Sequence, residues 1–189
     1  MDDTTFWWYV ARSSGMVALV VLMATVVWGA LLSGRLVNRP GAPRWLTDLH
    51  RYLGGLSCAI TALHLAALVA DSYSHFAWVE ILVPFGSSWK SGAVAWGVVA
   101  MYIVVIVEVT SVYQRRISRK VWRAIHMSSY GSFWMALIHG ATAGTDASAN
   151  WYRIGVLVGV IVTTWAVVAR ILGRAGSPKR RTRQSLPVS

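Results

Sequence analysis

Apolar stretches of about 20 residues recur along the whole chain, separated by short polar and basic segments. A helix of that length crosses a hydrocarbon core of roughly 30 Å, because each residue advances about 1.5 Å. We therefore expect an all-α integral membrane bundle over residues 1–172 and a basic, disordered tail over residues 173–189. The pattern predicts five spans, over residues 8–32, 48–70, 91–112, 121–141 and 152–172.

Composition and charge agree with this picture. Hydrophobic residues make up 56% of the chain and charged residues 13%, whereas soluble domains carry about 25% charged residues. The net charge of +11 does not indicate nucleic-acid binding, because most basic residues fall in the 33–47 and 113–123 loops and in the tail. The positive-inside rule makes that side cytoplasmic and places the N-terminus outside. We expect a multi-pass protein of a bacterial-type plasma membrane, surrounded by lipid.

Four of the five histidines fall in the second and fourth predicted spans, which run parallel from the cytoplasmic side outward. His50 and His126 lie near the cytoplasmic ends, and His64 and His139 lie 14 and 13 residues further along. The two levels are therefore about 20 Å apart. Facing histidines between bundle helices suit six-coordinate haem iron. We expect His50 to pair with His126 at an inner level and His64 with His139 at an outer level.

The phase of the fourth span does not fit a regular helix. Fourteen residues advance about 1400°, so His50 and His64 share one face. Thirteen residues advance about 1300°, which puts His126 and His139 some 140° apart. The span must overwind, bend or present its imidazoles differently, and we expect irregular geometry between Ser128 and Gly131.

Residues between the two levels are open to two interpretations. Small residues would let a flat macrocycle approach the backbone, and they would equally let plain helices pack closely. Phe133 and Trp134 lie midway along the fourth span, where an aromatic ring would either bridge two haems or simply pack. The small residues are Gly54, Gly55, Ser57, Ser128, Ser129 and Gly131.

Four arginines are candidate partners for anionic haem propionates. Arg51 follows His50 directly, and Arg44 and Arg123 lie near the same level, where ordinary positive-inside charge explains them equally well. Arg12 lies in the first span near the outside, where topology does not favour a cation. We expect Arg12 to bind a propionate of the outer haem; the alternative is that it snorkels to the interface.

Other polar residues have weaker assignments. Glu108 is expected to pair with Arg115 or Arg116, with proton exchange with a quinol as the alternative. Asp146 is expected to cap a turn or to shape access to the outer haem. The 71–90 loop would bind a metal-ion substrate or a partner protein, or would need no such role; its candidates are Asp71, Tyr73, His75 and Glu80.

The 14- and 13-residue spacings on two parallel spans resemble those of the ferric reductase-like transmembrane domain. That family includes NADPH oxidases, ferric reductases and the haem-binding membrane subunit of periplasmic methionine sulfoxide reductases. Five segments within residues 6–172 look like those of small stand-alone bacterial members. They are WWYVARSSG, LHRYLGGL, ILVPFGSSWKS, RKVWRAIH and HGATAGTD. The chain departs from larger members, which have six spans and a flavin and NADPH domain after the last one.

The resemblance implies that His50, His126, His64 and His139 are axial ligands of two haem b groups. It also implies electron flow outward, from a separate flavoprotein, reduced flavin or quinol donor to an extracytoplasmic acceptor. The chain would then be the electron-transfer subunit of an oxidoreductase, with no catalytic side chain of its own. Two alternatives remain open: a self-sufficient ferric or quinone-linked reductase, and a non-haem metal-binding transporter or membrane scaffold.

Overall fold

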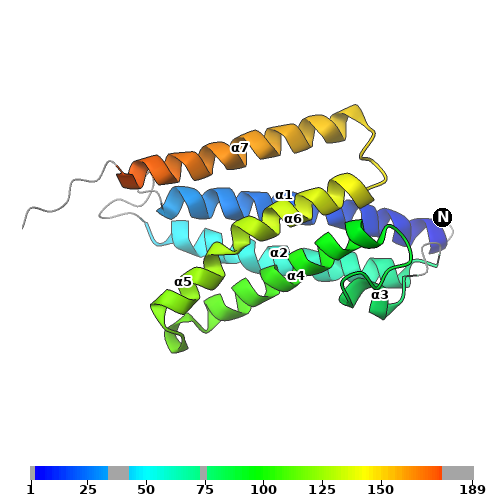
Figure 1. Ribbon diagram of the computed structural model, residues 1–189, viewed down its shortest axis with the longest axis horizontal. Helices are drawn as coiled ribbons and strands as arrows, with labels where there is room; N and C mark the ends of the chain where they lie inside the picture. The colour runs from blue at the N-terminus through cyan, green and yellow to red at the C-terminus, as the bar shows by residue number, and fades with distance from the viewer. Residues whose placement is uncertain (1–2, 34–42, 73–75, 176–189) are drawn as a thin grey trace, which may run out of the picture.

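A computed structural model describes residues 3–33, 43–72 and 76–175, and these ranges contain helices and no strand (Figure 1). The predicted all-α membrane bundle is confirmed, since α1, α2, α4 and α7 are each long and apolar enough to cross a membrane. The elements are α1 (Asp3–Ser33), α2 (Trp45–Ala70), α3 (Trp78–Leu82), α4 (Ser91–Val112), η1 (Gln114–Arg116), α5 (Arg119–Met127), α6 (Ser129–Ala143) and α7 (Asn150–Ala175).

Four of the predicted spans coincide with α1, α2, α4 and α7, and the observed helices are up to five residues longer at an end. The predicted tail begins inside α7, which continues to Ala175. The remainder of the tail, Tyr73 and His75 lie outside the described residues.

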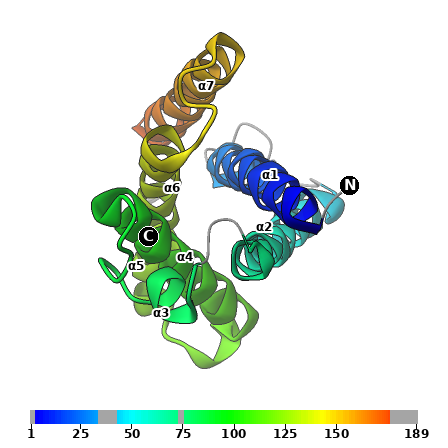
Figure 2. The same cartoon turned by 90° about the vertical axis from the view of Figure 1, so that its right-hand side faces the viewer.

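The helices form two antiparallel pairs (Figure 2). In one pair α1 lies along α2, and in the other α4 lies along α5 and α6, while α7 packs against α1. The first pair is joined by polar contacts as well as packing: Trp28 Nε1 donates to the Leu46 carbonyl at 2.8 Å, and the hydroxyls of Thr25 and Ser57 are 3.4 Å apart. In lipid, where apolar surface gives little drive for association, such contacts help to hold helices together.

The buried interior consists mainly of small side chains, which allow close approach of helix backbones. Phe133 is the largest fully buried side chain, with 1% of its surface exposed. Large apolar side chains point outward instead, as expected for surfaces that face lipid. On α7 they include Leu157, Ile161, Trp165 and Leu172.

The fourth span is broken at Ser128, within the stretch where irregular geometry was predicted. The amide of Ser128 donates to the carbonyl of Ile125 at 3.0 Å, an i to i−3 bond of the 3₁₀ type. Such a turn advances about 120° per residue, against 100° in an α-helix, so it overwinds the span locally. The hydroxyls of Ser128 and Ser129 also bond to the carbonyls three residues before them.

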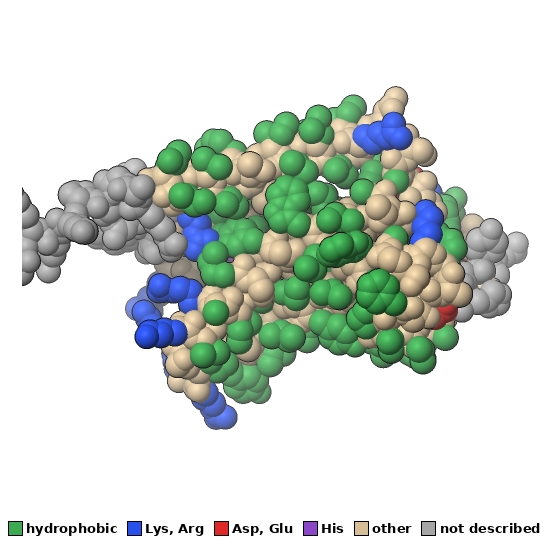
Figure 3. Space-filling model, viewed as in Figure 1, with side chains coloured by type: hydrophobic (Ala, Val, Ile, Leu, Met, Phe, Trp, Pro, Cys, Tyr) green, Lys and Arg blue, Asp and Glu red, His purple; other side chains and the backbone are tan. Residues whose placement is uncertain are grey.

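Basic side chains gather at the end of the bundle opposite the N-terminus (Figure 3). Those on η1 and α5 are all exposed, and the predicted orientation makes this end cytoplasmic. They are Arg115, Arg116, Arg119, Lys120 and Arg123.

At the end of the bundle where the N-terminus lies, Glu80 closes the segment that contains α3 (Figure 1). Its carboxylate accepts from the Ser88 amide at 3.0 Å, the Ala77 amide at 3.0 Å and the Ser88 hydroxyl at 3.1 Å. These bonds, led by that from the Ser88 amide, lower the pKa of Glu80 below its ordinary value of 4.5. The ionised carboxylate therefore stabilises this segment at pH values above the ordinary pKa of Glu80.

We predict that the stabilisation disappears as the pH falls through the lowered pKa of Glu80. Hydrogen exchange at the Ser88 amide, corrected for the intrinsic rate, should show protection at neutral pH and its loss in acid. Glu80→Gln, which cannot ionise, should show no such pH dependence. Protection of the wild-type amide that persists well below the lowered pKa would contradict the assignment.

Candidate functional site

The four histidines of the second and fourth spans come together in two pairs, and the rings of the inner pair face each other. At the inner level, the rings of His50 on α2 and His126 on α5 have centroids 5.9 Å apart and planes inclined at 72°. At the outer level, His64 on α2 and His139 on α6 are close enough for their charges to interact. The structure therefore brings together the residues that the sequence pairs.

Both histidines of α2 lie against glycines of α1. A Cβ atom at Gly15 would lie 3.0 Å from Cε1 of His64, and one at Gly29 would lie 2.8 Å from Cε1 of His50. The glycines are 14 residues apart, as are the histidines, so two antiparallel helices present matching positions. Any side chain on either glycine would displace an imidazole.

The second pair of helices repeats this arrangement with one change. A Cβ atom at Gly97 on α4 would lie 2.7 Å from Nδ1 of His139. Fourteen residues further along α4, the hydroxyl of Ser111 lies 3.4 Å from Nδ1 of His126. The α4 spacing is therefore also 14, and the 13-residue spacing of the histidines is accommodated by the break at Ser128. Sequence reasoning missed these four positions, although their 14-residue spacing matches that of His50 and His64.

Backbone carbonyls orient the outer imidazoles. Nδ1 of His64 donates to the carbonyl of Ala11 at 2.7 Å, and Nδ1 of His139 donates to that of Ala93 at 2.8 Å. Each carbonyl lies four residues before the glycine that the ring contacts. Because a carbonyl can only accept, Nδ1 carries the proton and Nε2 keeps a free lone pair.

The inner imidazoles are held less completely. The carbonyl of Thr25, four residues before Gly29, lies beside His50. The two groups do not reach hydrogen-bond geometry, and Nδ1 of His50 is buried without a partner among the described residues. His126 is supported by Trp122, whose ring stacks on it at a centroid distance of 4.9 Å.

The predicted propionate partners are in different surroundings. Arg12 forms an ion pair with the buried Asp146, through two hydrogen bonds, and lies 5.0 Å from the centre of the Trp8 ring. Asp146 thus ties the segment after α6 to α1. Arg44, Arg51 and Arg123 are exposed at the basic end of the bundle.

Glu108 faces α2, and not the basic turn after α4 where a partner was expected. A Cβ atom at Gly54 would lie 2.6 Å from Oε2 of Glu108. Arg51 is near enough for its charge to interact with this carboxylate. Of the two aromatics midway along the span, Phe133 is buried and Trp134 is 40% exposed, so only Phe133 lies inside the bundle between the levels.

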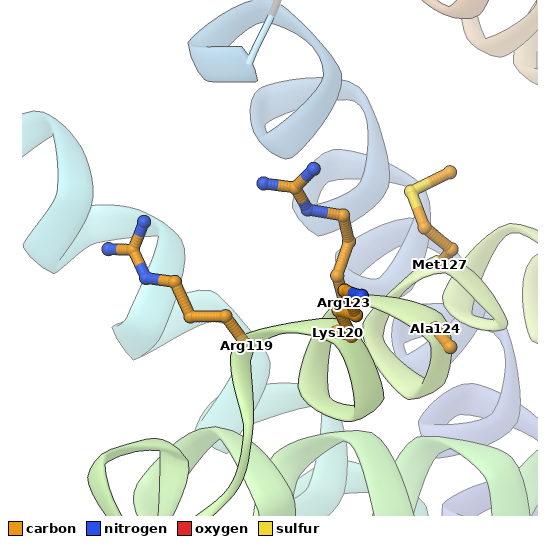
Figure 4. A pocket seen from close by; sticks show the side chains of 5 residues that line it. All are labelled: Arg119, Lys120, Arg123, Ala124 and Met127. Carbon is orange, nitrogen blue, oxygen red and sulfur yellow. The ribbon is translucent and has the colours of Figure 1, made fainter.

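A basic hollow of about 450 Å³ lies beside the inner level (Figure 4). Its described lining comes from one side of α5 and consists of Arg119, Lys120, Arg123, Ala124 and Met127. A smaller hollow of about 180 Å³ adjoins Arg119 and Arg123 and is also lined by Gln114 and Trp122. Since Trp122 stacks on His126, its ring connects the basic surface to the inner histidine pair.

Comparison with known families gives a match over most of the helical bundle. A model described as "Ferric reductase like transmembrane component" matches residues 14–137. The matched region runs from α1 into α6 and includes three of the four paired histidines, whereas His139 lies two residues beyond it. Comparisons with curated proteins and with solved structures find no match.

The glycine contacts lead to a paired prediction. Gly97→Ala should push the His139 ring away from the Ala93 carbonyl. The folded protein would then lose a hydrogen bond that contributes about 1 kcal/mol to its stability. Gly131→Ala on α6 is the control, because a Cβ atom there meets nothing within 4 Å. Alanine favours a helix by up to about 1 kcal/mol over glycine. Thermal unfolding in detergent should rank Gly131→Ala at or above wild type and Gly97→Ala below Gly131→Ala. Equal stability of the two variants would contradict the close contact.

Proposed function

Because the chain belongs to the ferric reductase-like transmembrane component family, we propose that it carries electrons across the membrane through two haem b groups. The family supports a role in transmembrane electron transfer in general. The proposal adds the cofactor and its ligands: His50 and His126 for the inner haem, and His64 and His139 for the outer haem. The observation that carries it is the facing pair of imidazoles at the inner level, with a second pair of histidines near each other at the outer level.

The inner pair has a spacing that suits one metal ion between two rings. An imidazole nitrogen binds a metal ion at about 2 Å, so rings on opposite sides of the ion have centroids roughly 6 Å apart. The observed separation of His50 and His126 is 5.9 Å. This agreement supports coordination by both residues.

The outer pair has the tautomer that a ligand needs. Histidines that bind metals usually donate the other ring N–H to a carbonyl or carboxylate, which fixes the ring. His64 and His139 both do so through Nδ1, and each leaves Nε2 free. Glycine beneath each ring lets the imidazole lie close to the neighbouring helix.

When bound, haem would supply one-electron chemistry, and the histidines would hold it, His50 with His126 at the inner level and His64 with His139 at the outer level. The protein's own residues orient the outer rings, and the basic end of the bundle would provide the entry for electrons. The basic hollow next to Trp122 favours a negatively charged donor, such as the phosphate of a reduced flavin or an acidic flavoprotein, over a neutral quinol. The acceptor would be on the opposite, extracytoplasmic side.

The alternative of a non-haem metal site has less support. Within residues 3–33, 43–72 and 76–175, no group of three or more His, Cys, Asp or Glu residues is placed to hold a metal ion. Two histidines alone leave a structural metal such as zinc without its usual four ligands. Haem differs, because it would need only two histidines from the protein.

Purified protein should contain two haem b groups per chain. The measurement is a reduced-minus-oxidised spectrum combined with a haem count against protein concentration. A colourless protein without a Soret band would exclude the proposal and favour the scaffold or transporter alternative.

Replacing one ligand should remove one haem. His64→Leu or His139→Leu should lose the outer haem, and His50→Leu or His126→Leu the inner one, which leaves about one haem per chain in each case. His75→Leu is the control, and we expect it to retain two. Full haem occupancy in every single variant would show that the pairing is wrong.

A further inference from the structure

Arg170 is a buried cation whose described neighbours carry no negative charge. Only 9% of its surface is exposed, although it lies on α7, a helix with many lipid-facing side chains. Its Nη1 donates to the Tyr130 hydroxyl at 2.5 Å and its Nη2 to Met127 Sδ at 3.2 Å. The guanidinium also lies 5.3 Å from the centre of the Tyr130 ring. These contacts fix the position of the group without neutralising it.

A buried guanidinium is strongly unfavourable unless an anion or several acceptors compensate for its lost hydration. No carboxylate in the described ranges lies within ion-pair distance of Arg170. Its Nε is buried and has no hydrogen-bond partner there. Arg170 Nε is therefore a donor for which the described residues supply no acceptor.

A second donor without a partner lies beside His126, which is also near Arg170. Trp122 stacks on His126, and its Nε1 is also buried without a hydrogen-bond partner among the described residues. Arg170 is close enough to His126 for the two charges to interact, and its partner Met127 is the next residue along the chain. Arg170 Nε and Trp122 Nε1 can only donate. Their common requirement is an oxygen acceptor, and the guanidinium favours one with negative charge.

We infer that Arg170 and Trp122 bind a carboxylate of the inner haem's propionates, with Tyr130 and Met127 positioning the guanidinium. This inference rests on the proposed function and assigns residues that the sequence did not single out. It differs from the predicted role of Arg44, Arg51 and Arg123, because those side chains are exposed and water weakens their interactions. A buried positive charge beside the inner haem disfavours its oxidised form and so raises its midpoint potential.

The test is a redox titration of the inner haem alone, in a His64→Leu background that lacks the outer one. Arg170→Met should change the ratio of oxidised to reduced haem at a fixed potential about tenfold, a midpoint lowered by about 59 mV. Arg170→Lys, which keeps the charge, should retain most of the wild-type midpoint. Arg153→Met is the matched control on the same helix, since Arg153 is exposed at the outer end, and it should shift nothing.

Arg170→Gln is a second neutral variant, in case the methionine variant does not fold, and its midpoint should fall likewise. Trp122→Phe keeps an aromatic ring but removes the N–H, and we expect a smaller shift in the same direction. An unchanged midpoint in a folded neutral variant, with haem still bound, would overturn the inference and leave the proposed function intact. Wild-type protein that binds no haem would overturn both.

A lipid phosphate offers the same charge and oxygen acceptors, so the titration has two arms. One uses detergent free of phospholipid, and the other uses nanodiscs of phosphatidylglycerol. A propionate partner predicts the Arg170→Met shift in both arms. A shift confined to the nanodiscs would assign Arg170 to lipid and overturn the inference.

Discussion

The close approach of antiparallel helices at the imidazole rings is the constraint on which both histidine levels depend. Three of the four rings lie where a neighbouring helix has glycine, and a methyl group there would come within about 3 Å of the ring. Since lipid gives helices little apolar drive to associate, such complementary surfaces and a few polar contacts must hold them together. The ring positions and the helix packing therefore cannot be changed independently.

The sequence predicted those features that a single segment encodes. The spans follow from local apolar runs, and the histidine levels follow from spacing and from the alternating direction of successive spans. By contrast, Arg12 meets Asp146, Glu108 meets Gly54 and Arg170 meets Tyr130, and each contact joins segments more than 35 residues apart. Charge and hydropathy cannot choose among such distant partners. The glycines opposite the histidines were detectable in principle, because they repeat the same 14-residue interval.

The break at Ser128 shows how the mismatch between the 13-residue histidine spacing and the period of an α-helix is resolved locally. A regular helix would turn His126 and His139 away from a common face by some 140°. A short 3₁₀-type turn occurs between them, and serine hydroxyls bond the carbonyls around this turn. The calculated angle between His126 and His139 indicated that the span is irregular, but it could not specify which hydrogen bonds would change.

The division of the bundle into two helical units also determines how the histidine pairs form. The α1–α2 unit supplies His50 and His64, and the unit of α4 with α5 and α6 supplies His126 and His139. Each unit thus contains one half of the inner pair and one half of the outer pair, and neither contains a complete pair. Docking of the two units creates both levels in one event, and their separation would abolish both. The two levels are therefore coupled during assembly, even though they lie about 20 Å apart along the bundle.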